Sequence, residues 1–285
     1  MMFEMDNIFI VIVLYNIRLE DSKTLASLNV HLENELNVFI YDNSSIPVSS
    51  SDSFKFDKLN ISYFSDQANS GISTAYNMAL AIANDQKKSW LLLLDQDTEI
   101  SESYLKEIKK IDFSNFSKDI VAIIPNIVSF GNVFISPAKM YTGGICIPVK
   151  LKSGKINKRI TSINSGTLIS TDFINTIGGF SSKFPLDMLD HWYFKKIYDN
   201  NKSVFLLNSS IKQELSVSKN FEENVSFERY KKMLYSENMF LKNQSILALI
   251  MFKIRLFTRI LKQIRYKNSS YYKLTFKYLF NSVDA

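Results

Sequence analysis

Short apolar runs alternate with amphipathic stretches through the first half of the chain, and this alternation limits the possible folds most strongly. Five runs rich in β-branched residues or leucine have the length of buried strands, at 8–14, 38–41, 61–64, 90–94 and 120–124. Three stretches between them have a helical pattern, at 21–36, 72–83 and 101–111. The pattern predicts an α/β fold with a mostly parallel central sheet that is covered by helices on both faces.

The second half of the chain is less regular. Strands are predicted at 145–149, 163–169 and 204–207. A short helix is predicted at 171–177, where Gly178 and Gly179 end it, and another is predicted to begin near Asp187. From Asn224 onward the sequence is predicted to be nearly all helix. No internal repeat and no long linker separates these parts.

Composition narrows the class of protein. Apolar residues make up 46% of the chain and charged residues 22%, which is enough for a sizeable core and argues against general disorder. Cys146 is the only cysteine, which excludes a disulfide within the chain and a four-cysteine zinc site. A reducing, cytoplasmic location fits this best. The first residues lack the basic region and cleavage site of a signal peptide, so we expect none.

Positive charge is concentrated at the C-terminal end. From Ile246 onward there are eight Lys and Arg residues against one acid, Asp284, a local balance of 8 − 1 = +7, whereas the whole chain carries +6. The rest of the chain is therefore close to neutral. A basic tail of this kind indicates an anionic partner.

Polar residues follow three of the predicted strands, where a parallel sheet binds its ligands. Tyr15 and Asn16 follow the first strand, Asp42 follows the second, and Asp95 and Asp97 follow the all-leucine fourth strand. Two carboxylates one residue apart repel each other unless a divalent cation lies beside them, and oxygen ligands suit Mg²⁺ or Mn²⁺. The alternative is that both acids only form a turn before the next helix.

Two further segments carry candidate polar groups. Asn69, Ser70 and Gly71 open a helix, where free amides can face a phosphate, although an ordinary helix cap is the alternative. There is no P-loop motif. Asp187 and Asp190 are three residues apart in an aromatic segment, with Asp187 as the predicted cap and Asp190 as a candidate general base. The alternative is a capped helix with a solvated second acid.

Residues 246–264 are predicted to form an amphipathic helix. A basic side is predicted with Arg255, Arg259, Lys262 and Arg265, and an apolar side with Ile254, Phe257, Ile260, Leu261 and Ile264. Such a helix suits the interface of an anionic membrane, and the alternative is packing on the domain or on a second subunit as a homodimer. No recognised nucleic-acid-binding module accompanies it, so we expect no nucleic-acid partner.

In order along the chain, these segments resemble the family 2 glycosyltransferases of the GT-A fold, and more narrowly bacterial rhamnosyltransferase-type members. The resemblance runs from Ile8 to about Glu237. The matching motifs are Tyr15-Asn16, Asp42-Asn43-Ser44, Asn69-Ser70-Gly71 with Ala75 and Asn77, Asp95-Gln96-Asp97-Thr98, Ser165-Gly166, Gly178-Gly179-Phe180 and the segment from Asp187 to Asp190.

The resemblance implies a division of roles among these residues. The residues that it places on the nucleotide-sugar donor are Tyr15, Asn16, Asp42, Asn69, Gly71, Asn77 and Asp95. Mg²⁺ or Mn²⁺ would be bound by Asp97 with Asp95, and Asp190 would be the catalytic base, with Asp187 as the second choice. The residues expected on the acceptor side are Ser165, Gly166, His191, Trp192 and Arg229. His191 has interior packing as its alternative role.

The sequence departs from the family pattern at two places. Family members often carry Val-Asp-x-Glu-Trp near the base, whereas this chain has Leu189-Asp190-His191-Trp192 and no glutamate there. Many members also complete the metal site with a histidine, and Gln213 stands at that position, followed by Glu214. We expect Gln213 or Glu214 to reach the metal through a side-chain oxygen, and the alternative is an ion that is held only weakly.

The resemblance implies an inverting transferase that moves a sugar, with rhamnose from dTDP-rhamnose as the first choice, to a lipid-linked oligosaccharide of an O-antigen or capsule. It would act at the inner face of the cell membrane. The catalytic GT-A domain would span residues 1–220, with a donor half of about 1–125 and an acceptor half of about 126–220, followed by a helical extension at 221–285. The alternatives are a nucleotidyltransferase of similar fold and a non-catalytic membrane-associated partner of a polysaccharide assembly system.

Overall fold

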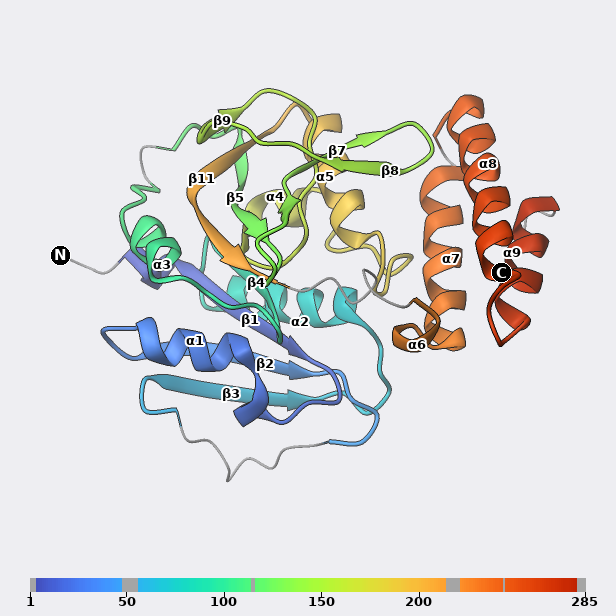
Figure 1. Cartoon of the computed structure of the whole chain (residues 1–285). Coiled ribbons are helices and arrows are strands. Elements are labelled where there is room, and N and C mark those ends of the chain that lie inside the picture. The colour runs from blue at the N-terminus through green and yellow to red at the C-terminus, as the bar shows by residue number, and fades with distance from the viewer. Residues whose placement is uncertain (1–3, 48–55, 114–115, 214–220, 243, 281–285) are drawn as a thin grey trace. The chain divides into compact units, whose positions relative to one another are not determined.

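The computed structural model describes residues 4–47, 56–113, 116–213, 221–242 and 244–280 (Figure 1). The chain divides into two compact units. The sheet unit consists of residues 1–138, 148–185 and 189–214, and the helical unit consists of residues 139–147, 186–188 and 215–285.

The sheet unit is built on one mixed sheet whose strand order is β3-β2-β1-β4-β10-β5-β11-β9, with β6 paired to β5. The bounds of its strands are β1 Ile8–Leu14, β2 Leu36–Asp42, β3 Leu59–Ser65, β4 Trp90–Asp95, β5 Ile120–Val128, β6 Phe134–Ser136, β9 Gly154–Ile156, β10 Thr167–Ser170 and β11 Ser203–Lys212. The strands that share one direction are β3, β2, β1, β4, β5 and β11. The reversed strands are β6, β9 and β10. The expected α/β fold with a largely parallel sheet is therefore confirmed.

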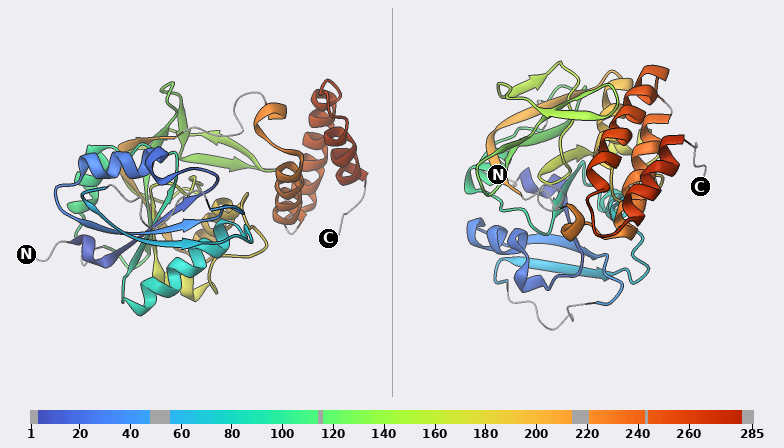
Figure 2. Two further views of the ribbon diagram at one scale, coloured as in Figure 1. Left: turned by 90° about the horizontal axis from the view of Figure 1, so that it is seen from below. Right: turned by 45° about the vertical axis from the view of Figure 1, so that its right-hand side comes forward.

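Helices cover both faces of this sheet. Their bounds are α1 Lys23–His31, α2 Ile72–Asp85, α3 Glu102–Lys109, α4 Thr171–Thr176 and α5 Leu189–Asp199. Side chains of α1 and α3 join alternate residues of β1 and β4 in one apolar core, whereas α2 lies on the opposite face (Figure 2). Every residue from Leu91 to Leu94 is fully buried, which explains why this strand has no polar residue before its end.

Several predicted elements have different bounds in the structure. The helix predicted at 21–36 is shorter because β2 already begins at Leu36. The strand predicted at 163–169 begins only at Thr167, because Gly166 has a φ of 77° that interrupts extended backbone. The prediction that Asp187 caps a helix is wrong, because α5 begins at Leu189 and Met188 adopts a φ of 69°.

In the described part of the helical unit, the single turn α6 Phe221–Asn224 is followed by three long helices, α7 Phe227–Lys242, α8 Ile246–Gln263 and α9 Ser270–Phe280. The helices pack pairwise (Figure 1). Tyr230 of α7, Phe252 and Leu256 of α8 and Tyr271 of α9 form the buried centre. A separate hairpin joins β7 Ala138–Tyr141 to β8 Ile145–Pro148. Within the described residues, no helix has the length and apolar character needed to cross a membrane.

The orientation of α8 differs from a simple two-sided pattern. Ile260 was expected on the apolar side with Phe257, but it faces the interior and is 8% exposed. Arg255 and Arg259, expected on a solvated basic side, are both turned toward Glu237 of α7. Ile254, Phe257, Leu261 and Ile264 of the expected apolar side are exposed, and so are Lys262 and Arg265 of the expected basic side.

Candidate active site

Three strands of the sheet unit end together and bring the predicted polar residues to one edge. Asp42 ends β2 and pairs in register with Leu14 of β1, and Asp95 ends β4 and pairs with Val13. Asp42 and Asp95 therefore flank the end of β1, directly before Tyr15. This is the carboxyl edge at which open α/β sheets bind ligands.

An acidic pair lies at the centre of this edge. Gln213, just after β11, donates from Nε2 to Asp95 Oδ2 at 2.7 Å and to Asp97 Oδ1 at 3.4 Å. Burial, and then repulsion from Asp97, raises the pKa of Asp95 to about 7, and the Gln213 hydrogen bond only partly opposes this. Two carboxylates are thus brought together at a cost that a cation would relieve.

Asp190 belongs to the same group of charges. It lies in the first turn of α5, and its negative charge also contributes to the raised pKa of Asp95. Asp190 Oδ1 accepts a hydrogen bond from the His191 amide at 2.7 Å, while His191 Nδ1 pairs with Thr161 Oγ1 at 2.7 Å. Asp190 is therefore placed at the acidic edge, and His191 is engaged beside it.

Asp187 and Arg229 form a separate pair in the helical unit, with Arg229 Nη2 3.8 Å from Asp187 Oδ1. An arginine partner stabilises an ionised carboxylate and weakens it as a proton acceptor. This contact favours Asp190 over Asp187 as the base. Trp192 packs near Phe184 in the sheet unit, with 6.4 Å between ring centroids.

The segments after β2 and β3 are connected by hydrogen bonds. Asp42 Oδ1 accepts from the Ser44 amide at 3.0 Å, and its Oδ2 accepts from the Tyr63 hydroxyl at 2.5 Å. Asn43 Oδ1 accepts from the Gly71 amide at 3.0 Å. Gly71 has a φ of 95°, and an added Cβ would lie 2.3 Å from the Pro185 carbonyl oxygen. Only glycine fits at the start of α2.

Four other predicted donor-side features lie at or near this edge. The Tyr15 amide donates to Gln96 Oε1 at 2.6 Å, and its side chain is about half exposed. Asn16 and Asn69 both adopt left-handed backbone, with φ of 53° and 51°. Asn77 binds the Phe180 backbone with both ends of its amide, at 2.8 Å each. These contacts occupy Asn77, and its predicted contact with a donor stays a prediction.

Ser165 and Gly166 bind the backbone of β4 at Asp95 and Leu93. The Asp95 amide donates to Ser165 Oγ at 3.1 Å, and the Gly166 amide donates to the Leu93 carbonyl at 2.8 Å. An added Cβ on Gly166 would lie 2.5 Å from Ile211 Cδ1. Both residues are buried, so their observed contacts hold β4 and its acids in place, and the predicted contact with an acceptor stays a prediction.

The comparison with protein families identifies the family to which the chain belongs. The family model for glycosyl transferase family 2 matches residues 9–172, which is more than half of the chain. The chain belongs to glycosyl transferase family 2. This family membership supports a glycosyltransferase that uses a nucleotide-sugar donor, and it favours that function over a nucleotidyltransferase. No curated protein sequence matches the chain.

Two solved structures of S. aureus TarS share the fold. S. aureus TarS residues 1–349 superpose with a TM-score of 0.55 at 17% identity, covering 95% of this chain and 78% of TarS 1–349. A longer S. aureus TarS structure gives a TM-score of 0.53 at 17% identity, covering 92% of this chain and 44% of that one. This chain thus spans less than half of the longer TarS chain. The mannosyltransferase PcManGT from Pyrobaculum calidifontis, in complex with GDP-Man and Mn²⁺, has 9% identity and a TM-score of 0.49, with coverage of 94% and 78%, too distant to support an argument.

The divalent cation implied by the fold fits the residues at the acidic edge. Among the described residues, no group of three or more His, Cys, Asp or Glu side chains is placed to hold an ion. Gln213 contacts both Asp95 and Asp97, and Glu214, the other candidate, lies outside the described residues. Gln213 is 6% exposed, and its Oε1 has no hydrogen-bond partner in the described structure. Rotation of that amide by half a turn would present this oxygen to a cation beside Asp95 and Asp97.

Two residues of this edge were missed by sequence reasoning. Asp66 accepts hydrogen bonds from the Tyr41 hydroxyl at 2.8 Å and the Ser70 amide at 2.7 Å. Burial alone would raise the pKa of Asp66, but these hydrogen bonds outweigh it and lower that pKa. Tyr76 of α2 is fully buried, and burial followed by the charge of Asp95 raises its hydroxyl pKa far above the ordinary value. The spacing Asp66 to Ser70, just before a helix, was the available signal for Asp66.

Proposed function

We propose that this glycosyltransferase transfers a sugar, with inversion, from a nucleoside-diphosphate donor to a hydroxyl group of a lipid-linked glycan. The observation that carries the proposal is the meeting of Asp95 and Asp97 at one amide, with Gln213 Nε2 2.7 Å from Asp95 Oδ2 and 3.4 Å from Asp97 Oδ1, within range of the charge of Asp190. Such a concentration of negative charge at a ligand-binding edge favours a metal-assisted reaction of a diphosphate over a purely structural turn.

The proposed donor site uses the ends of the first three strands and the start of α2. Asp42 would contact the nucleotide base, and Asn69 and Gly71 would lie near the ribose and diphosphate. Tyr15 and Asn16 would close the same side. A Mg²⁺ or Mn²⁺ ion held by Asp97, Asp95 and Gln213 would neutralise charge on the departing nucleoside diphosphate.

In the proposed reaction, Asp190 removes the proton from the acceptor hydroxyl group. The acceptor oxygen forms a bond to the anomeric carbon on one face of the sugar. The bond from that carbon to the diphosphate oxygen breaks on the opposite face, and its electron pair leaves with the nucleoside diphosphate. One displacement of this kind inverts the anomeric centre.

The base assignment can be tested with matched amides. Asp190→Asn should lower kcat by roughly 10²-fold or more, while Kd for the donor stays within about twofold. Asp187→Asn should retain most of the turnover. Release of nucleoside diphosphate in the presence of acceptor measures kcat, and calorimetry measures Kd. Full turnover by Asp190→Asn would show that the base has been assigned wrongly.

The sugar and the acceptor belong to the same proposal. We infer rhamnose carried by dTDP, and an O-antigen or capsule intermediate as acceptor, from the motif order described above. A thermal-shift screen of nucleotide sugars with and without Mn²⁺ tests the donor, because a ligand that binds only the folded state raises Tm. A larger shift with another nucleotide sugar than with dTDP-rhamnose would exclude rhamnose as the donor sugar.

We also propose a location at the inner face of the cell membrane, with α8 in contact with anionic lipid. A homodimer through the same helix remains the alternative.

We also propose that the catalytic domain ends at residue 220 and that its donor and acceptor halves meet near residue 125. A chain that failed to bind any nucleotide sugar would instead support a non-catalytic partner of a polysaccharide assembly system, an alternative that Gln213, in place of the usual histidine, leaves open.

A further inference from the structure

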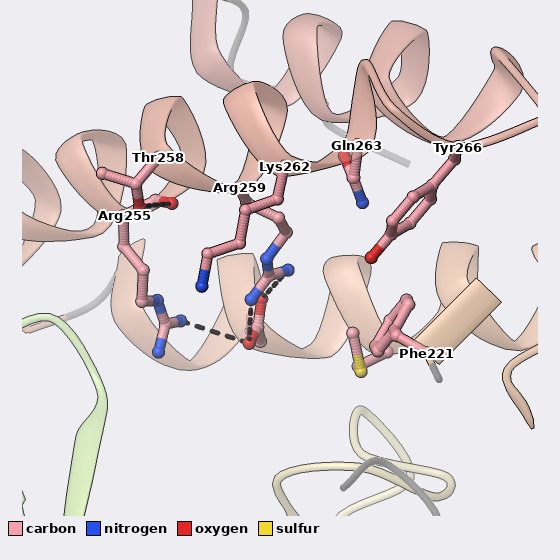
Figure 3. A pocket seen from close by; sticks show the side chains of 9 residues that line it. Phe221, Arg255, Thr258, Arg259, Lys262, Gln263 and Tyr266 are labelled. Carbon is pink, nitrogen blue, oxygen red and sulfur yellow. Dashed lines mark hydrogen bonds and ion pairs between the residues drawn. The ribbon is translucent and has the colours of Figure 1, made fainter. Parts of the chain in front are cut away.

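A pocket of about 400 Å³ lies within the helical unit, between α8, α7 and α6 (Figure 3). It is lined by Phe221, Met233, Glu237, Arg255, Thr258, Arg259, Lys262, Gln263 and Tyr266. Three of these side chains are cationic and one is anionic, so the lining carries 3 − 1 = +2 charges. None of the residues proposed for sugar transfer lines it.

The one carboxylate in the pocket is already occupied. Arg259 binds Glu237 with two parallel hydrogen bonds, Nη1 to Oε2 at 2.8 Å and Nη2 to Oε1 at 3.0 Å. Burial works against the charge on Arg259, but Glu237 outweighs it and raises the pKa of the guanidinium. Arg255 approaches the same carboxylate, with Nη2 3.2 Å from Oε1. Glu237 therefore cannot neutralise both arginines and Lys262 as well.

Two buried donors in the pocket are left without an acceptor. Gln263 is 1% exposed, and its Oε1 accepts from Thr275 Oγ1 at 2.6 Å, but its Nε2 has no hydrogen-bond partner among the described residues. Arg255 Nε is also buried and has no hydrogen-bond acceptor among the described residues. Figure 3 shows the ends of Lys262 and Gln263 directed into the space between the helices. Unfilled donors and excess positive charge both call for an anion with several acceptor oxygens.

The adjoining face of α8 supplies a second, independent observation. Ile250, Ile254, Phe257, Leu261 and Ile264 follow one another at alternating spacings of four and three residues, and each is 51–58% exposed. They therefore form one continuous apolar row, which we call the α8 row, of about 21 Å at a rise of 1.5 Å per residue. Thr258 of the pocket lies one helical turn from Ile254 and Leu261, so the pocket borders the row.

Charge decides which partner fits the α8 row. Residues 246–280 contain eight Lys or Arg residues and no acid. A second copy of this chain, packed through the same row, would bring one basic helix against another. An anionic lipid would instead neutralise the basic residues, and its acyl chains would contact the apolar side chains of the α8 row.

We propose that the α8 row inserts into the interface of a membrane and that the pocket binds the phosphate or diphosphate group of a lipid there. The inference rests on the proposed function only in suggesting the lipid-linked acceptor as one source of that group. The recognition itself depends on Arg255, Lys262 and Gln263.

Binding of inorganic pyrophosphate to the full chain in EDTA, measured by calorimetry, tests the pocket. Lys262→Glu should weaken Kd by roughly tenfold, because a charge-assisted contact is replaced by a repulsive one. Lys267→Glu makes the same change of charge on an exposed residue outside the pocket lining and should alter Kd by less than about twofold. Lys262 is exposed, so both variants should keep the Tm of the wild type. Equal Kd values for the two variants would overturn the proposed pocket.

Flotation with vesicles distinguishes a lipid phosphate from a free one. Phosphatidylcholine vesicles that contain phosphatidic acid should capture the wild type, and Lys262→Glu should reduce capture more than Lys267→Glu. The triple variant Ile254→Gln, Phe257→Gln, Leu261→Gln should lose capture while its Kd for pyrophosphate is unchanged. Pyrophosphate binding without capture would assign the pocket to a free phosphate and overturn the lipid source. Capture by the triple variant, or a wild type that dimerises through the row, would overturn the membrane role of the row.

These measurements need no sugar donor, so they separate the two proposals. Asp190→Asn should bind pyrophosphate and vesicles as the wild type does, even if sugar transfer is lost. A fully active enzyme whose Lys262→Glu variant bound pyrophosphate normally would contradict only the pocket.

Discussion

The acidic pair should make the stability of the metal-free protein fall as pH rises. Asp95 has a pKa of about 7 in the folded chain against an ordinary value of 3.8, raised by burial and then by Asp97. Between pH 3.8 and about pH 7, folding is therefore accompanied by uptake of a proton on Asp95. The contribution of this proton to stability is complete near pH 3.8 and falls as the pH rises to about 7. Each pH unit inside it costs up to about 1.4 kcal/mol, so the change from pH 5 to pH 7 is about 3 kcal/mol at most.

Urea unfolding in EDTA at several pH values measures this loss. Asp95→Asn removes the titrating group, and the free energy of unfolding of the wild type minus that of the variant isolates its contribution. Asp97→Asn should reduce the slope without abolishing it, because burial, the larger cause, remains. Mn²⁺ should restore stability more at pH 8 than at pH 5, because it binds the ionised pair. Parallel stability curves for the wild type and Asp95→Asn would refute the reasoning.

Three further substitutions test single contacts. Gly71→Ala should lower the free energy of unfolding by roughly 2–4 kcal/mol through its backbone clash, whereas Gly178→Ala, with a similar positive φ but open space around it, should cost only about 1 kcal/mol in the same urea assay. Glu237→Gln should lower Tm strongly, since breaking a buried pair costs about 3–5 kcal/mol, whereas Glu228→Gln, which loses only an exposed pair, should lie within about 0.5 kcal/mol of the wild type. Gln213→His should tighten Mn²⁺ binding by roughly tenfold in calorimetry, because imidazole is the stronger ligand, and unchanged binding would show that residue 213 does not reach the ion.

Local pattern was sufficient for the elements whose burial is uniform. The run at 90–94 predicts a central strand because only such a strand excludes water from four successive leucines, and β4 has that position. The residues that follow it were found for the same reason, since a polar pair has to lie where the apolar run ends. The fold class could therefore be predicted before any long-range contact was known.

Contacts between distant segments could not be predicted in this way. Ser165 was expected in a strand, but it turns to accept a hydrogen bond from the Asp95 amide, 70 residues away in sequence. Asp187 was expected to cap a helix, but Met188 takes a left-handed conformation and Asp187 pairs with Arg229 instead. Neither event leaves a periodic signal, because each depends on a single partner that folding brings close.

The tail shows why an amphipathic pattern determines a helix but not its orientation. Periodicity alone separates Arg255 and Arg259 from Phe257, and it suggests that the charged side faces water. Glu237 of α7 reverses that expectation. A buried carboxylate without a cationic partner is costly, so Glu237 draws Arg255 and Arg259 inward to pair with it. With both arginines directed inward, Ile260 is still buried, but the α8 row stays exposed. An exposed apolar row is costly in water, so its persistence beside a cationic pocket is best explained by a partner that is itself apolar and anionic.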